Sequence, residues 1–138
     1  MRIFFYFNSI LKKIHFAIDK TSKANASQKA LLKRYRNYLP NQSNVIVVIG
    51  GDGFMLETLK KYRKYKRPFY GMNRGTFGFL MNKFKTKNIK KSISKAKPVS
   101  ISALEMRAIT KDNIKKSAIA INEVSSVSYT HLTLPTKA

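Results

Sequence analysis

Residues 45–53 read VIVVIGGDG and indicate the fold class. The first five residues are apolar and β-branched, which is typical of a strand buried on both faces of a parallel sheet. Apolar side chains then recur at helical spacing, at Phe54, Met55, Leu56, Leu59 and Tyr62. We therefore expect a strand, a glycine turn and a helix in direct succession, which is the basic step of an α/β fold.

Upstream of this stretch, residues 13–18 read KIHFAI and are predicted to form the first strand. Thr21 and Ser22 are good caps for a helix that we expect to run from about residue 26 to 38, where Pro40 stops it. Its buried stripe is predicted to consist of Ala30, Leu31, Leu32, Tyr35 and Leu39.

Downstream, Arg67-Pro68 is predicted to end the helix that follows the glycine turn, before a third strand at 69–72. A basic helix is expected at about 86–97, ended by Pro98. Two weakly alternating strands are then expected at 99–110 and 117–124, joined by a turn at Asp112-Asn113.

This order of elements predicts a doubly wound α/β domain with a parallel sheet at residues 1–98. The first strands of a β-rich domain are expected at 99–125. Residues 1–12 are either an additional strand or an upstream extension.

Composition narrows the class of protein. Of the 138 residues 43% are hydrophobic, which allows a packed core, and the lack of cysteine excludes disulfides and thiolate metal sites. The apolar runs are too short for a membrane span or a signal peptide, so we expect a cytoplasmic protein without membrane contacts. The net charge of +22 comes mostly from lysines, which we expect on solvated faces. No nucleic-acid-binding module accompanies them, so specific nucleic-acid binding is not expected, although a basic nucleic-acid-binding domain stays an alternative.

The glycine turn suits phosphate chemistry. Gly50, Gly51 and Gly53 allow positive φ and close backbone approach, and N–H groups at a helix start attract anions. A carboxylate at Asp52 would repel phosphate unless it takes a proton from an attacking hydroxyl or holds Mg²⁺. The alternative is a tight turn in which Asp52 caps the helix.

Two further motifs follow. Residues 71–82 read GMNRGTFGFLMN and place glycines around polar residues at a strand end. Asn122 and Glu123 form a polar pair inside a strand-like run, although both residue types are depleted in strands. Alone, these motifs also suit a glycine-rich connection and a solvent-facing strand.

Together the three motifs resemble the NAD kinase family, over roughly residues 13–125. That family carries a GGDG loop, a G-x-N-x-G-x-x-G-F-L loop and a later Asn-Glu pair, and the wording here is similar to its alphaproteobacterial branch. GGDG alone is shared with diacylglycerol kinases, so a lipid kinase is the second enzyme alternative. The resemblance implies the fold of the NAD kinases and diacylglycerol kinases, with the β-rich domain truncated in this chain, which we expect to be inactive alone.

The resemblance also implies roles for single residues. Asp52 would accept the proton of the 2′-hydroxyl of the adenosine ribose of NAD, and Gly53 would approach the nucleotide through its backbone. Nucleotide contacts are likewise implied for Gly50, Gly51, Asn73, Phe79, Asn122 and Glu123. Phe79 would line the adenine pocket, while Asn122 and Glu123 would bond the base and the ribose. Phe54 stands where the family commonly has threonine.

The implied cofactors and partners are small molecules. Phosphoryl would pass from ATP or polyphosphate to NAD with the help of Mg²⁺ or another divalent cation, giving NADP. The full-length protein is expected to be a homo-oligomer.

The last residues do not continue the fold. Residues 126–136 read SVSYTHLTLPT and show no amphipathic pattern. From Val127 to Thr136 they back-translate into a transposase sequencing-library adapter. We therefore expect the native sequence to end near Ser125, with residues 126–138 a non-native tail.

Overall fold

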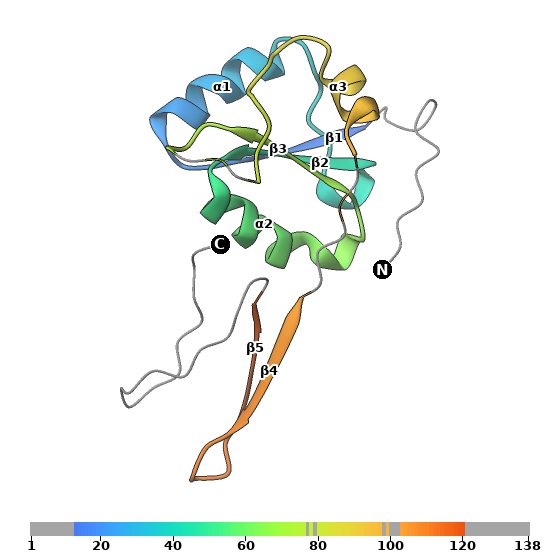
Figure 1. Ribbon diagram of the computed structural model, residues 1–138. Coiled ribbons are helices and arrows are strands. Elements are labelled where there is room, and N and C mark those ends of the chain that lie inside the picture. Colours follow the sequence, from blue (N-terminus) through green and yellow to red (C-terminus); the bar gives the residue numbers. More distant parts are fainter. Residues whose placement is uncertain (1–12, 77, 79, 98, 100–102, 121–138) are drawn as a thin grey trace. The chain divides into compact units, whose positions relative to one another are not determined.

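A computed structural model describes residues 13–76, 78, 80–97, 99 and 103–120 (Figure 1). Contacts divide the chain into two compact units, Met1–Pro98 and Val99–Ala138.

The first unit is built on a parallel sheet of three strands, β1 (Ile14–Ile18), β2 (Val45–Gly50) and β3 (Phe69–Asn73). β2 lies between the other two, with Ile14 of β1 beside Val45 and Phe69 of β3 beside Ile46. Every residue of β2 is buried, as its continuous β-branched run predicts. Full burial of each Val or Ile side chain contributes about 1.5–3 kcal/mol to folding.

Helices cover both faces of this sheet (Figure 1). α1 (Ser22–Leu32) and α3 (Ile89–Lys95) lie on one face, and α2 (Asp52–Tyr62) lies on the other. The core on the α1 and α3 face consists of Ile14, Phe16, Ala24, Leu31, Val45, Val47, Ile49, Met72, Ile89 and Ile93. The core on the α2 face consists of Ala17, Ile46, Val48 and Met55. The prediction of a doubly wound α/β domain is confirmed.

The predicted bounds of the first helix were wrong. α1 begins at Ser22 because the Thr21 hydroxyl accepts a hydrogen bond from the Ala24 N–H at 3.2 Å. It ends at Leu32 because the chain then turns back beside β1. There the Asn37 side chain accepts from the Phe16 N–H at 2.9 Å, and the Tyr38 N–H donates to the Ile14 carbonyl at 2.9 Å.

The predicted buried stripe of this helix was also partly wrong. Its buried residues are Ala24, Ser27 and Leu31, whereas Leu32 and Leu39 are 45% and 61% exposed. Leu39 lies beyond the end of α1, and Leu32 follows the buried Leu31 and so points to another side of the helix.

Other elements are shorter than predicted. α2 stops at Tyr62, and a 3-10 turn at Arg63–Tyr65 ends in Lys66, whose φ of 52° is left-handed. Pro40 begins a 3-10 turn, Pro40–Gln42. α3 covers only Ile89–Lys95 of the predicted 86–97.

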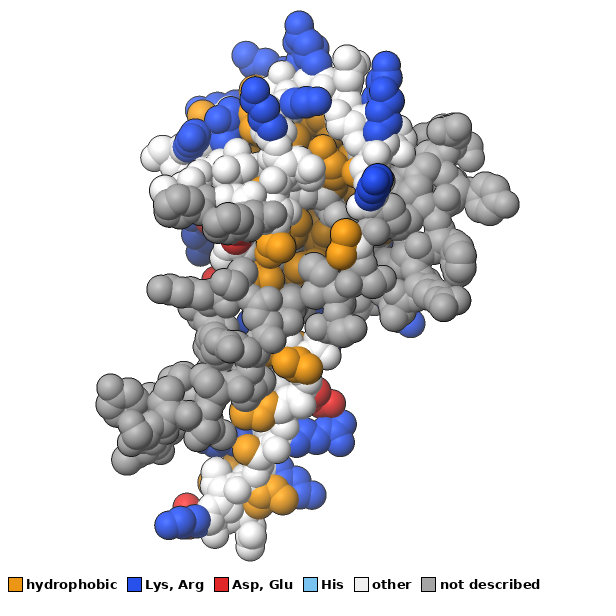
Figure 2. Space-filling view, viewed as in Figure 1, with side chains coloured by type: hydrophobic (Ala, Val, Ile, Leu, Met, Phe, Trp, Pro, Cys, Tyr) orange, Lys and Arg blue, Asp and Glu red, His pale blue; other side chains and the backbone are white. Residues whose placement is uncertain are grey.

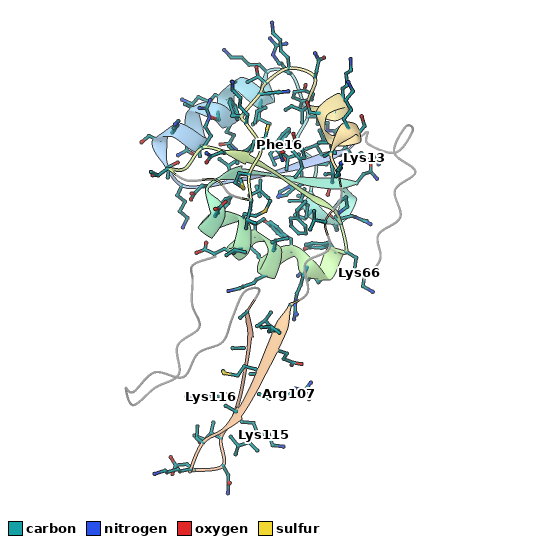
Figure 3. All side chains as sticks on the ribbon, in the orientation of Figure 1. Lys13, Phe16, Lys66, Arg107, Lys115 and Lys116 are labelled. Carbon is teal, nitrogen blue, oxygen red and sulfur yellow. The ribbon has the colours of Figure 1, made fainter. Side chains whose placement is uncertain are left out.

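The second unit contains an antiparallel hairpin of β4 (Leu104–Ile109) and β5 (Lys115–Ala120). Its turn includes Asn113 with a φ of 59°, so the predicted turn at Asp112-Asn113 is confirmed. Arg107, Lys115 and Lys116 project from its strands (Figure 3). Residues 121–124 of the predicted last strand lie outside the described residues.

Positive charge lies on the surface of the helices, as the composition predicts. Figure 2 shows Lys and Arg side chains gathered over α1 and α3. The exposed lysines of these helices are Lys23, Lys29, Lys90, Lys91 and Lys95. None of the helices in the described part of the chain is long and apolar enough to cross a membrane.

Candidate functional site

The carboxyl ends of the three parallel strands meet at one edge of the sheet, where ligands of open α/β sheets bind. Asp19 follows β1, Gly51 follows β2 and Arg74 follows β3. The Asp19 N–H donates to the Ile49 carbonyl at 3.0 Å, and the Arg74 N–H donates to the Gly50 carbonyl at 2.7 Å. Both neighbouring strand ends are therefore tied to the end of β2.

The Gly-Gly-Asp-Gly turn joins β2 directly to α2. Gly50 is the last residue of β2, Gly51 is the N-cap of α2, and Asp52 is the first helical residue. The alternative in which Asp52 is the N-cap is therefore wrong. Because Gly51 has no side chain, the N–H groups of the first turn have no capping side chain. Such a helix start favours an anion through its N–H groups and dipole.

Asp52 links the two glycine loops. Its Oδ1 accepts a hydrogen bond from the Leu80 N–H at 2.9 Å, across 28 residues of sequence. The half-buried carboxylate is thereby held at the mouth of α2 beside the second loop. A carboxylate fixed in this way is in a defined position to receive a proton.

The second loop is held against the outer edge of β3. The Asn73 N–H donates to the Asn82 carbonyl at 2.8 Å, and the Asn82 N–H donates to the Gly71 carbonyl at 2.8 Å. The Asn82 side-chain amide also donates to the Gly71 carbonyl, at 3.1 Å. These bonds return the chain to β3 at Asn82, and near this point the Leu80 N–H donates to Asp52.

Close approach, and not positive φ, explains Gly75 and Gly78, since no described glycine has positive φ. A Cβ atom on Gly75 would lie 2.8 Å from the Gly51 Cα, so the two loops touch backbone to backbone. A Cβ on Gly78 would lie 2.7 Å from Cγ of Asn73. The glycines therefore let the two loops pack directly on each other.

Asn73 has a structural role in this arrangement. Its Oδ1 accepts from the Gly75 N–H at 3.0 Å, which shapes the turn after β3. Gly50, Gly51, Asp52, Gly53 and Asn73 are thus brought to one edge of the sheet. The remaining predicted site residues, Phe79, Asn122 and Glu123, lie outside the described residues.

Two charged residues at this edge, Asp19 and Arg74, were not among the predicted site residues. Asp19 lies beside the turn, since a Cβ on Gly50 would be 3.0 Å from the Asp19 Cβ. The Arg74 guanidinium carbon lies 3.7 Å from the centre of the Phe84 ring. Asp19 directly follows the predicted first strand and Arg74 comes two residues after the predicted third strand, so the rule that sites form at the carboxyl ends of parallel strands would have found them.

Metal-ligating side chains are sparse. The described residues contain no group of three or more His, Cys, Asp or Glu side chains that would hold a metal ion by themselves. A cation at this edge would therefore need ligands from a bound phosphate as well.

A strand-glycine-helix turn packed against a second glycine loop defines an α/β protein whose sheet edge has the features of an anion site. The family described as "ATP-NAD kinase N-terminal domain" matches residues 2–97. The chain belongs to this family.

Curated relatives agree. The chain is 41% identical over 112 residues to the NAD kinase of Brucella suis biovar 1 (strain 1330), covering 81% of the chain and 44% of the relative. It is 39% identical over 118 residues to the NAD kinase of Rhizobium meliloti (strain 1021), covering 86% and 44%. It is 38% identical over 121 residues to the NAD kinase of Caulobacter vibrioides (strain ATCC 19089 / CIP 103742 / CB 15), covering 88% of the chain and 46% of the relative. The chain thus spans less than half the length of these relatives.

Proposed function

We propose that the complete protein transfers a phosphoryl group from ATP or polyphosphate to the 2′-hydroxyl of the adenosine ribose of NAD, giving NADP. The observation that carries this proposal is the position of Asp52. Its carboxylate lies at the start of α2 and accepts from the Leu80 N–H of the second loop at 2.9 Å. It therefore stands where an anion-binding helix start and the second glycine loop meet.

The chain's residues would act mainly by positioning. Asp52 accepts the proton of the 2′-hydroxyl as its oxygen forms a bond to the terminal phosphorus of the donor. The bond from that phosphorus to the bridging oxygen breaks, and the shortened donor leaves with the electron pair. The N–H groups at the start of α2 favour the phosphate charge throughout, because they are already oriented before substrate binds.

A divalent cation fits this edge. Mg²⁺ is commonly held by one or two carboxylates together with substrate phosphates, and Asp52 offers one such carboxylate. When bound, the cation supplies charge neutralisation for the phosphates.

The proposed function also involves residues outside the described ones and the assembly of the complete protein. Phe79, Asn122 and Glu123 would contact the substrate nucleotide. The α/β domain would occupy residues 1–98 and the start of a β-rich domain residues 99–125. The complete protein would be a cytoplasmic homo-oligomer.

The test is NAD phosphorylation by the complete protein with Asp52→Asn. Asparagine keeps an oxygen that can accept from the Leu80 N–H, so the loops stay joined. We expect turnover to fall about 100-fold or more because the proton acceptor is lost, with NAD affinity largely unchanged.

Glu57→Gln is the matched control, because Glu57 is an exposed carboxylate on the same helix. It should keep wild-type turnover. Unchanged turnover for Asp52→Asn would contradict the role of Asp52. Phosphorylation of diacylglycerol in place of NAD would replace the proposed function with that of a lipid kinase.

A further inference from the structure

Arg74 lies on the opposite side of the glycine turn from α2. Its neighbour Asn73 pairs with Gly50, and a Cβ on Gly50 would point at Phe54 of α2. Arg74 follows Asn73 and places its guanidinium over Phe84, which packs against the core on the α1 and α3 face. The Gly50 carbonyl accepts a hydrogen bond from the Arg74 N–H at 2.7 Å, which holds the Arg74 backbone beside the glycine turn.

The charge of Arg74 is held in place, and no carboxylate of the described residues forms an ion pair with it. The guanidinium carbon is 3.7 Å from the centre of the Phe84 ring, a cation–π contact that limits where the group can lie. Within the described residues, the ion pair is between Arg107 and Glu105 and does not involve Arg74. Its Nε is buried and has no hydrogen-bond acceptor among the described residues. A preorganised guanidinium of this kind is suited to phosphate oxygens, which it bonds in pairs.

The acidic residues around the glycine turn would make a positive charge favourable there when phosphate binds. Asp52 and Asp19 both flank the Gly50-Gly51 turn, and their carboxylates repel a polyanion. A fixed positive charge on the same edge would offset this repulsion.

We propose that Arg74 binds the terminal phosphates of the phosphoryl donor, on the side of the glycine turn away from Asp52. This inference rests on the proposed phosphotransfer and adds a donor contact to it. Asp52 then faces the hydroxyl that receives the phosphoryl group, while Arg74 holds the group that gives it. In an in-line displacement the attacking and the leaving oxygen lie on opposite sides of the transferred phosphorus, and in this proposal Asp52 serves the attacking side and Arg74 the donor side.

Arg67 provides a matched control at the other end of β3. Its Nε is also buried and without an acceptor among the described residues, so that property alone does not mark a phosphate site. However, its Nη2 lies 3.5 Å from the Asn41 carbonyl, and the residue precedes β3, so the whole strand separates it from the glycine turn.

Direct binding of inorganic tripolyphosphate to the complete protein tests the proposal without reference to NAD. Titration calorimetry would compare wild type, Arg74→Gln and Arg67→Gln. We expect the dissociation constant to rise about tenfold or more for Arg74→Gln, because a charge-assisted contact is lost. Arg67→Gln should stay within about twofold of wild type, because the salt-screened field of one remote charge is small. Equal losses in both variants, or no loss in Arg74→Gln, would overturn the proposal.

Steady-state kinetics of the complete protein add a second readout. Arg74→Gln should raise the KM for ATP and leave the KM for NAD unchanged, whereas a rise for NAD alone would overturn the donor assignment. Arg74→Lys keeps the charge but loses the planar guanidinium that bonds phosphate oxygens in pairs, so it should restore donor binding only in part. Thermal unfolding of each variant checks that it folds. If wild type does not phosphorylate NAD, the proposed function fails, while tripolyphosphate binding still decides the role of Arg74.

Discussion

The two ends of the parallel sheet use their residues differently. At the amino ends of the strands, cations rest on tyrosine rings: Lys13 lies 5.8 Å from the centre of the Tyr38 ring, and Lys61 lies 5.2 Å from that of Tyr62. Lys13 and Lys66 lie at this end (Figure 3). At the carboxyl ends, two glycine loops touch through their backbones and hold Asp52 between them. Aromatic rings and cations thus meet at the amino end, whereas at the carboxyl end, where phosphate is proposed to bind, glycines let two loops approach backbone to backbone.

Backbone conformation shows the same contrast. Near the amino end of β3, Lys66 has a φ of 52°, a conformation that favours glycine. The glycines of the carboxyl end have no positive φ. Glycine is therefore used where a side chain would block a contact, and it is missing where the backbone alone would favour it.

The largest effect is expected from Gly75→Ala. The new Cβ would lie 2.8 Å from the Gly51 Cα, and backbone on both sides must shift to admit it. We expect a loss of about 1–3 kcal/mol in the free energy of unfolding, measured by urea denaturation, and lower NAD phosphorylation by the complete protein.

Gly53→Ala is the control for this prediction, because a Cβ there meets nothing within 4 Å. Its free energy of unfolding should match wild type or exceed it, since alanine favours a helix. Equal destabilisation of the two variants would show that close loop packing does not explain Gly75.

A smaller effect of opposite sign is expected at the amino end, from Lys66→Gly. Glycine adopts the left-handed conformation without the steric cost that lysine has there, which stabilises the folded state by about 1–2 kcal/mol. The greater conformational entropy of glycine in the unfolded chain offsets about 0.5–1 kcal/mol of this gain. The free energy of unfolding should therefore rise modestly, with NAD phosphorylation unchanged. A fall in phosphorylation with intact stability would show that the amino end takes part in the reaction.

The smallest effect concerns His15, also at the amino end. Burial lowers its pKa below the ordinary value near 6.5, the Tyr38 carbonyl opposes this shift, and Lys61 adds to it. The unfolded chain therefore binds the proton more readily. The contribution of His15 to stability is complete above about pH 6.5 and is lost as the pH falls through the lowered pKa of the folded state.

His15→Gln keeps a donor for the Tyr38 carbonyl, which accepts from Nδ1 at 2.8 Å in the native protein. The free energy of unfolding of this variant should decline less between about pH 7.5 and pH 5 than that of wild type. Parallel pH profiles for the two proteins would rule out His15 as the titrating group.

Local pattern was enough to predict the frame of the sheet. β2 followed from an unbroken β-branched run, and the hairpin turn followed from Asp112-Asn113, because both depend on neighbouring residues. The end of α1 was missed because it depends on Asn37 pairing with β1, a contact that helical spacing does not reveal.

At the site, too, contacts between distant segments could not be predicted from the local pattern. The glycines and Asp52 were recognisable as phosphate chemistry from their order alone. The bond from the Leu80 N–H to Asp52 was not, because it joins segments that meet only once β2 and β3 have paired. Arg74 was visible in the sequence, but its stacking on Phe84 depends on the chain folding back past β3.

Hydrogen exchange of the complete protein, followed by mass spectrometry with and without NAD, tests the central contrast most directly. If the carboxyl end of the sheet is the nucleotide site, peptides covering residues 50–56 and 71–76 will gain protection. Peptides covering residues 13–15 and 63–68, at the amino end, will exchange as before. Protection of the amino-end peptides, or of neither set, would contradict the account.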